Sequence, residues 1–123
     1  MNRDAPTHPP LLVACLCAQW CGTCRDYRAV MDQVQRGFVG RVPPFTWVDI
    51  EDHDEVAGSL DIEDFPTLLI ARGDELLFFG SVTPHAQTLS RLVQSALDGS
   101  LHMRSDDAEL HGLPQRVRTL LAG

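Results

Sequence analysis

Cys21 and Cys24 stand three residues apart at the junction of two stretches with different periodicity. The stretch before them, Leu11–Ala18, is an apolar run without helical spacing, which is typical of a buried parallel strand. After them, apolar residues recur at three- and four-residue steps (Tyr27, Val30, Met31, Val34 and Phe38). This stripe predicts an amphipathic helix that ends near Gly37 or Gly40. The chain therefore passes from a strand into a helix at the two cysteines.

A pair of thiols at a helix start favours dithiol chemistry. The helix N-terminus carries partial positive charge and unsatisfied N–H groups, so a thiolate there is stabilised and its pKa falls. The thiolate is the nucleophile, so we expect Cys21 to attack a substrate disulfide and Cys24 to resolve the mixed disulfide. The Cys-x-x-Cys spacing alone is shared with zinc sites. The preceding Trp20, the strand behind it and the helix ahead strengthen the redox interpretation.

The remaining sequence alternates strand-like and helix-like stretches. Strands are expected at Phe45–Ile50, Thr67–Ala71 and Leu76–Phe79, the last two forming an antiparallel hairpin. Helices are expected over Glu51–Leu60, with packing positions Val56, Ala57 and Leu60, from Thr83-Pro84 to Gly99, and over Leu113–Leu121. Asp98–Gly112 is expected to be a connecting loop. This order predicts an α/β fold with a mixed sheet and helices on both faces.

Length and charge narrow the class of protein. A chain of 123 residues fits one domain, and its net charge of −7 argues against nucleic acid or an anionic membrane as partner. Leu12-Val13-Ala14-Cys15 is similar to a lipoprotein cleavage site, but no apolar signal core precedes it. We therefore expect a cytoplasmic protein, where paired cysteines are more often catalytic or metal-binding than structural. We expect no cofactor and a monomer or weak dimer.

The chain resembles the thioredoxin family over roughly Leu11–Leu97. The resemblance is carried by Trp20-Cys21-Gly22-Thr23-Cys24 after a strand, by Phe65-Pro66-Thr67 before a strand, and by Gly80 and the helix after the hairpin. It implies a thioredoxin-like fold in which Pro66 is cis and packs beside the redox cysteines. It also implies a substrate groove for an extended peptide; its residues would be Trp20, Gly22, Thr23, Phe65, Pro66 and Thr67.

Several positions depart from the family pattern. We expect the usual first strand and helix to be lacking, because ten residues precede Leu11 in this sequence; that sheet edge would then be missing or replaced, with the C-terminal segment as a candidate. Cys15 replaces the family's buried acid, and Phe45 falls near the position of the lysine often paired with it. Thr23 stands where thioredoxin itself has proline. The usual proton-transfer pair is therefore absent, and general dithiol reductase activity does not follow from the motif alone.

Cys15 and Cys17 are two residues apart on the predicted strand, so both point toward the motif helix. A disulfide between them would need distortion, because their Cα atoms would lie roughly 6.5 Å apart. One interpretation makes both small buried hydrophobes. In a second interpretation, Cys15 is a modulator that approaches Cys24 from the strand beneath the motif helix and exchanges protons or a disulfide with it. A third, a Cys₄ metal site, is awkward within one chain, on one rigid strand and one helix, and leaves a cluster shared by two chains through Cys21 and Cys24 as its remaining form; no metal ligand is assigned.

The sequence thus predicts a thioredoxin-like domain over residues 11–99, after a flexible lead-in over 1–10 and before a C-terminal extension over 100–123 with a helix. The expected function is thiol–disulfide exchange with protein disulfides through Cys21 and Cys24, contributing to cell redox homeostasis. Thioredoxin reductase or a glutathione system is the expected reductant. The alternative is a non-catalytic redox sensor or a dedicated partner-binding module; a metal-binding protein is the third interpretation.

Overall fold

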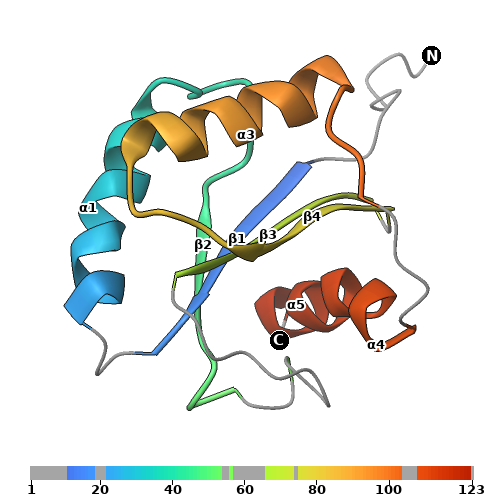
Figure 1. Ribbon diagram of the computed structural model, residues 1–123. Coiled ribbons are helices and arrows are strands. Elements are labelled where there is room, and N and C mark those ends of the chain that lie inside the picture. Colours follow the sequence, from blue (N-terminus) through green and yellow to red (C-terminus); the bar gives the residue numbers. More distant parts are fainter. Residues whose placement is uncertain are drawn as a thin grey trace.

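The computed structural model describes residues 11–18, 22–53, 56, 66–73, 75–103 and 108–122. Its elements are β1 (Leu11–Cys17), α1 (Gly22–Arg36), β2 (Thr46–Asp49), β3 (Thr67–Arg72), β4 (Glu75–Ser81), α3 (Ala86–Asp98), α4 (Ala108–His111) and α5 (Leu113–Ala122). The strands form one sheet in the order β2-β1-β3-β4, and helices cover both faces (Figure 1). The mixed sheet flanked by helices that the sequence predicts is confirmed.

Strand β1 is central and separates two apolar clusters. It pairs in parallel with β2 and antiparallel with β3, and all seven of its residues are buried. Successive side chains point to opposite faces of a sheet. The odd-numbered residues accordingly join the cluster shared with α1 and α3, whereas the even-numbered ones join the cluster shared with α4 and α5. Cys15 and Cys17 therefore both face α1, as expected.

Helices α1 and α3 cover the face of the sheet that carries these cysteines (Figure 1). The buried side of α1 consists of Cys24, Tyr27, Met31 and Val34, at the spacing of a helical stripe. Helix α3 buries Leu89, Val93 and Ala96, and it ends at Gly99, whose φ of 80° is left-handed. Glycine adopts this conformation at little cost, so the predicted stop at Gly99 is confirmed.

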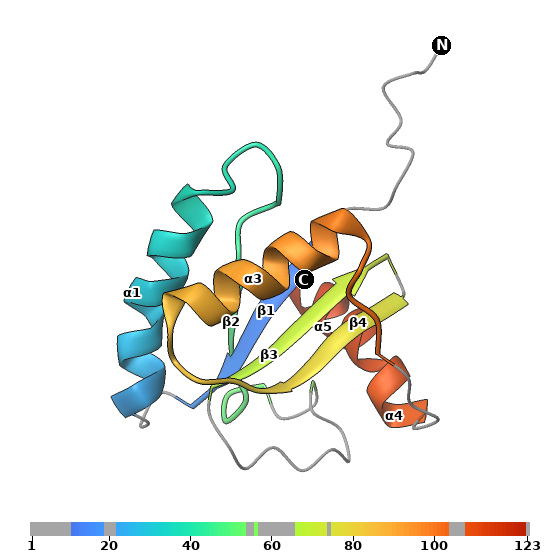
Figure 2. The ribbon, with the colours of Figure 1, turned by 45° about the horizontal axis from the view of Figure 1, so that its top comes forward.

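The C-terminal helices cover the opposite face of the sheet (Figure 2). Leu110, Leu113 and Val117 are buried there against even-numbered residues of β1 and against Leu69 of β3. The C-terminal segment thus packs on a face of the sheet and does not supply an edge strand. In the described part of the chain, β1 is the first element and β2 is the strand at that edge of the sheet.

Three local expectations need correction or fall outside the structure. Helix α3 begins at Ala86 rather than at Thr83-Pro84, because the His85 N–H donates to the Thr83 carbonyl and His85 itself is extended. The expected loop over 98–112 contains the short helix α4. Most of the helix expected over 51–60 lies outside the described residues, although the Val56 side chain is buried. No helix in the described part is long and apolar enough to cross a membrane.

Candidate redox site

Three chain segments meet at the carboxyl end of β1. This strand ends at Cys17, and helix α1 begins at Gly22. Thr67, the first residue of β3, pairs with Leu16 of β1. Pro66 precedes Thr67, and its carbonyl accepts a hydrogen bond from Val82 N–H. The structure therefore brings the Pro66-Thr67 motif to the same end of the sheet as the cysteine motif.

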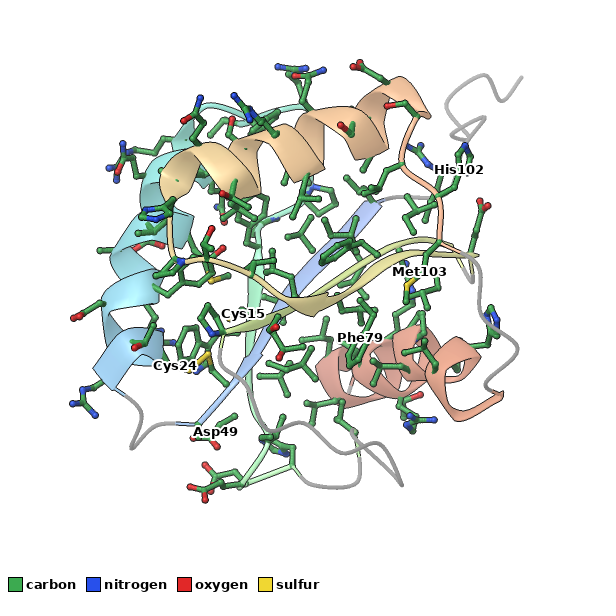
Figure 3. All side chains as sticks on the ribbon, viewed as in Figure 1. Cys15, Cys24, Asp49, Phe79, His102 and Met103 are labelled. Carbon is green, nitrogen blue, oxygen red and sulfur yellow. A yellow bond between two sulfur atoms is a disulfide. The ribbon has the colours of Figure 1, made fainter. Side chains whose placement is uncertain are left out.

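The disulfide in the structure joins Cys17 to Cys24, with their Cα atoms 5.9 Å apart. Both residues are completely buried. This pairing differs from the expected one between Cys21 and Cys24, and it corrects the interpretation of Cys17 as a small buried hydrophobe. The cause is tertiary: Cys17 lies on the face of β1 that meets α1, and Cys24 lies on the buried stripe of α1. Figure 3 shows Cys24 on the side of α1 that faces the sheet.

Cys15 is a free, completely buried thiol beside this disulfide. Its Sγ lies 3.4 Å from Cys17 Sγ. Because Cys17 carries no proton in the disulfide, the Cys15 S–H group is the donor and Cys17 Sγ the acceptor. The sulfur in contact with Cys15 is that of Cys17, the disulfide partner of Cys24, and the expectation that Cys15 exchanges protons or a disulfide with Cys24 stays a prediction. The two strand cysteines are not bonded to each other, as their spacing predicts.

Burial raises the pKa of the Cys15 thiol from 9.0 to about 12, against a smaller lowering by the Arg28 guanidinium. Cys15 is therefore a neutral thiol at physiological pH. Trp47 lies across from Cys15 on β2, and Phe45 precedes that strand. The Arg28 guanidinium lies 4.6 Å from the centre of the Trp47 ring. A cation from α1 thus acts on Cys15, where the family pattern has a strand lysine.

The raised pKa of Cys15 predicts a loss of stability at alkaline pH. The unfolded thiol ionises near its ordinary value of 9.0, whereas the folded thiol keeps its proton to about 12. The contribution of the protonated Cys15 thiol to the free energy of unfolding is thus complete below pH 9 and is lost as the pH rises toward 12. At pH 10 the loss is about 1.4 kcal/mol. Urea unfolding between pH 7.5 and 10 measures it. The variant Cys15→Ala should show a flatter profile; an identical slope would contradict the expectation.

Tyr27 adds a polar group to the same interior. It follows Cys24 by one helical turn, is completely buried, and its hydroxyl has no hydrogen-bond partner among the described residues. Burial, with a smaller contribution from Cys15, raises the pKa of the Tyr27 hydroxyl well above its ordinary value. Tyr27 is therefore a neutral donor in the apolar cluster that contains Cys15, Cys17 and Cys24.

The other predicted site residues divide into three groups. Trp20, Cys21 and Phe65 lie outside the described residues. Gly22 and Thr23 are exposed on the first turn of α1, whereas Pro66 and Thr67 are buried. The groove role of these residues and the cis geometry of Pro66 stay predictions. No group of three or more potential metal ligands is gathered in the described part of the chain.

Sequence reasoning missed the roles of Cys17, Arg28 and Tyr27. A signal for Cys17 was present, because alternation along β1 points Cys15 and Cys17 toward the face where Cys24 lies. Tyr27 was assigned only to the apolar stripe, although a tyrosine hydroxyl three residues after a buried cysteine adds a donor to the core. Nothing in the local pattern marks Arg28, whose position depends on the approach of α1 to β2.

The chain is similar in sequence to known thioredoxins. The Thioredoxin family model matches residues 5–95. Thioredoxin M3, chloroplastic, of Oryza sativa subsp. japonica is 34% identical over 58 residues, which are 47% of this chain and 33% of that protein. Thioredoxin of Listeria monocytogenes is 30% identical over 74 residues, 60% of this chain and 71% of that protein. The chain thus spans about a third of the chloroplastic relatives.

Solved structures show the same fold. The thioredoxin of Trypanosoma brucei brucei has a TM-score of 0.63 at 24% sequence identity, covering 78% of this chain and 82% of that one. Mitochondrial thioredoxin 3 of Saccharomyces cerevisiae, in its oxidised form, has a TM-score of 0.61 at 17% identity, covering 71% and 79%. At this level of identity the likeness extends to the fold alone.

Proposed function

Because the chain belongs to the thioredoxin family, we propose that it is a thiol–disulfide oxidoreductase that acts on protein disulfides. The observation that carries the proposal is the disulfide formed by Cys24, the second cysteine of the Cys-x-x-Cys motif, in the first turn of α1. Disulfides in this position are formed and broken by attack of a neighbouring thiolate. A thioredoxin reductase or a glutathione system is the proposed source of electrons.

In the proposed reaction, Cys21 is the nucleophile and Cys24 is the resolving thiol. Cys21 is followed by the exposed Gly22 and Thr23, and the first turn of α1 contains no acidic residue that would oppose a thiolate. The Cys21 thiolate attacks a substrate disulfide and forms a mixed disulfide. Cys24 then attacks Cys21 Sγ and releases the reduced substrate. The buried position of Cys24 keeps external thiols away from it.

A redox sensor or dedicated partner-binding module is the second candidate function. The observation that favours it is the burial of the Cys17–Cys24 bond, which no protein substrate can touch directly. A sensor needs reversible oxidation but no rapid turnover. The two functions therefore differ in rate rather than in the chemistry of the bond.

Reduction of insulin by dithiothreitol, followed by turbidity, tests the proposal. The wild-type protein should shorten the lag of precipitation in proportion to its concentration, and Cys21→Ser should return the rate to that of dithiothreitol alone. Reversible oxidation without any acceleration of insulin reduction would favour the sensor. Equal activity of wild type and Cys21→Ser would contradict the assignment of the nucleophile.

A further inference from the structure

We infer that Cys17 is a third redox-active cysteine, and that the disulfide of Cys24 alternates between Cys21 and Cys17 during turnover. The inference rests on the proposed function, because it requires Cys21 to meet the substrate. It goes beyond that function by moving the oxidised bond from the motif into the protein interior. The motif thiol is then free while the protein is still oxidised.

Burial of the observed bond makes such an exchange necessary. Cys15, Cys17 and Cys24 are all completely buried, so none of them can reach the disulfide of a folded protein substrate. The chain has four cysteines, and the fourth is Cys21. If the Cys17–Cys24 bond forms by reducing a protein disulfide, the electrons have to leave through Cys21. Since Cys24 forms one disulfide at a time, its bonding partner must change from Cys21 to Cys17.

The exchange is balanced within the chain. After substrate reduction the bond joins Cys21 to Cys24. The Cys17 thiolate attacks Cys24 Sγ, so the Cys17–Cys24 bond forms, the Cys21–Cys24 bond breaks, and Cys21 leaves as a thiolate. The proton lost by Cys17 is balanced by the one that Cys21 takes up, and no external oxidant is consumed. In the reverse step Cys21 attacks Cys24 and Cys17 is the leaving group.

The interior supplies a hydrogen-bond donor where this leaving group appears. The Cys15 thiol lies 3.4 Å from Cys17 Sγ and donates to it. A hydrogen bond to a thiolate favours the charged form, so the same contact eases the departure of Cys17. The Tyr27 hydroxyl is buried in the same cluster without a partner among the described residues. An unpartnered buried hydroxyl is unfavourable in a static core, so this interior holds a donor that the oxidised state leaves unused.

Native-state labelling tests this exchange in the full chain. Reduced protein is oxidised by excess insulin without added reductant, labelled with iodoacetamide while folded, and digested with trypsin. All four cysteines fall in the single peptide Asp4–Arg25, so fragmentation assigns the label and the bond. Wild type should carry close to one label, on Cys21, together with a Cys17–Cys24 bond. Cys17→Ala should lose that label almost completely, because its oxidised bond joins Cys21 to Cys24.

Val13→Ala is the matched control, because it truncates a buried side chain on the same face of the same strand but leaves all four cysteines. It should keep the label on Cys21 and the Cys17–Cys24 bond. A Cys21–Cys24 bond in oxidised wild type would overturn the inference, even if Cys17→Ala does not fold. A protein that fails to reduce insulin would instead count against the proposed function. In that case wild type is oxidised with diamide, and a Cys17–Cys24 bond supports the inference on Cys17 whereas a Cys21–Cys24 bond overturns it.

Discussion

Replacing Cys24 with alanine is expected to stop turnover with the substrate still attached through Cys21. Cys24 takes part in the observed Cys17–Cys24 bond and in the proposed Cys21–Cys24 bond, and it lies on the buried side of α1. Well-oriented intramolecular groups reach effective concentrations of about 10⁵ M or more, whereas an external thiol acts at millimolar concentration. These concentrations differ by about 10⁸-fold, so release of substrate should slow by well over about 1,000-fold. Insulin reduction and non-reducing gels, which display the mixed disulfide, measure this effect.

The same substitution should also weaken the oxidised protein. The Cys17–Cys24 bond closes a short loop, because the two residues are separated by seven positions. Constraining a loop of this size in the unfolded chain is worth about 2–3 kcal/mol. Val34→Ala, on the same buried face of α1, is the control: it should lower stability without trapping substrate. Turnover of Cys24→Ala close to that of wild type would contradict the role of Cys24.

The order of strands and helices could be predicted because the local spacing of apolar residues differs between strands and helices. β1 is fully buried and α1 shows one apolar stripe, and both patterns are visible without knowledge of the fold. Helix α4 was missed because four residues contain too little of a helical period. The start of α3 was misplaced because a turn bond between His85 and Thr83 competes with the helix after Pro84.

The bond in the site could not be predicted in the same way. Local spacing favours Cys21 as the partner of Cys24, because residues three apart on a helix start are close in any fold. The observed partner, Cys17, comes within 5.9 Å (Cα to Cα) only when α1 packs on the odd-numbered face of β1. The same tertiary packing brings the charge of Arg28 to bear on Cys15. Nonlocal packing thus determined the chemistry that the motif alone left open.

The second large effect is expected on the opposite face of the sheet, at Leu113 of α5. This side chain is completely buried in the cluster that includes Leu16 and Leu69. Truncation of a buried leucine to alanine removes apolar contacts and leaves a cavity, which costs about 2.7–5 kcal/mol. Leu113→Ala should therefore lower the free energy of unfolding by this amount, a large share of the about 5–15 kcal/mol typical of a small domain. Urea unfolding followed by tryptophan fluorescence measures the change.

Leu121→Ala is the matched control on the same helix, because the Leu121 side chain is 52% exposed. A surface substitution of this kind changes stability by about 0.5 kcal/mol or less. Since the Leu113 cluster faces away from Cys17 and Cys24, the folded fraction of Leu113→Ala should keep the wild-type rate of disulfide exchange. Equal stability of the two variants would mean that α5 does not pack on the sheet. A slower exchange in fully folded Leu113→Ala would show instead that the two faces of the sheet are coupled.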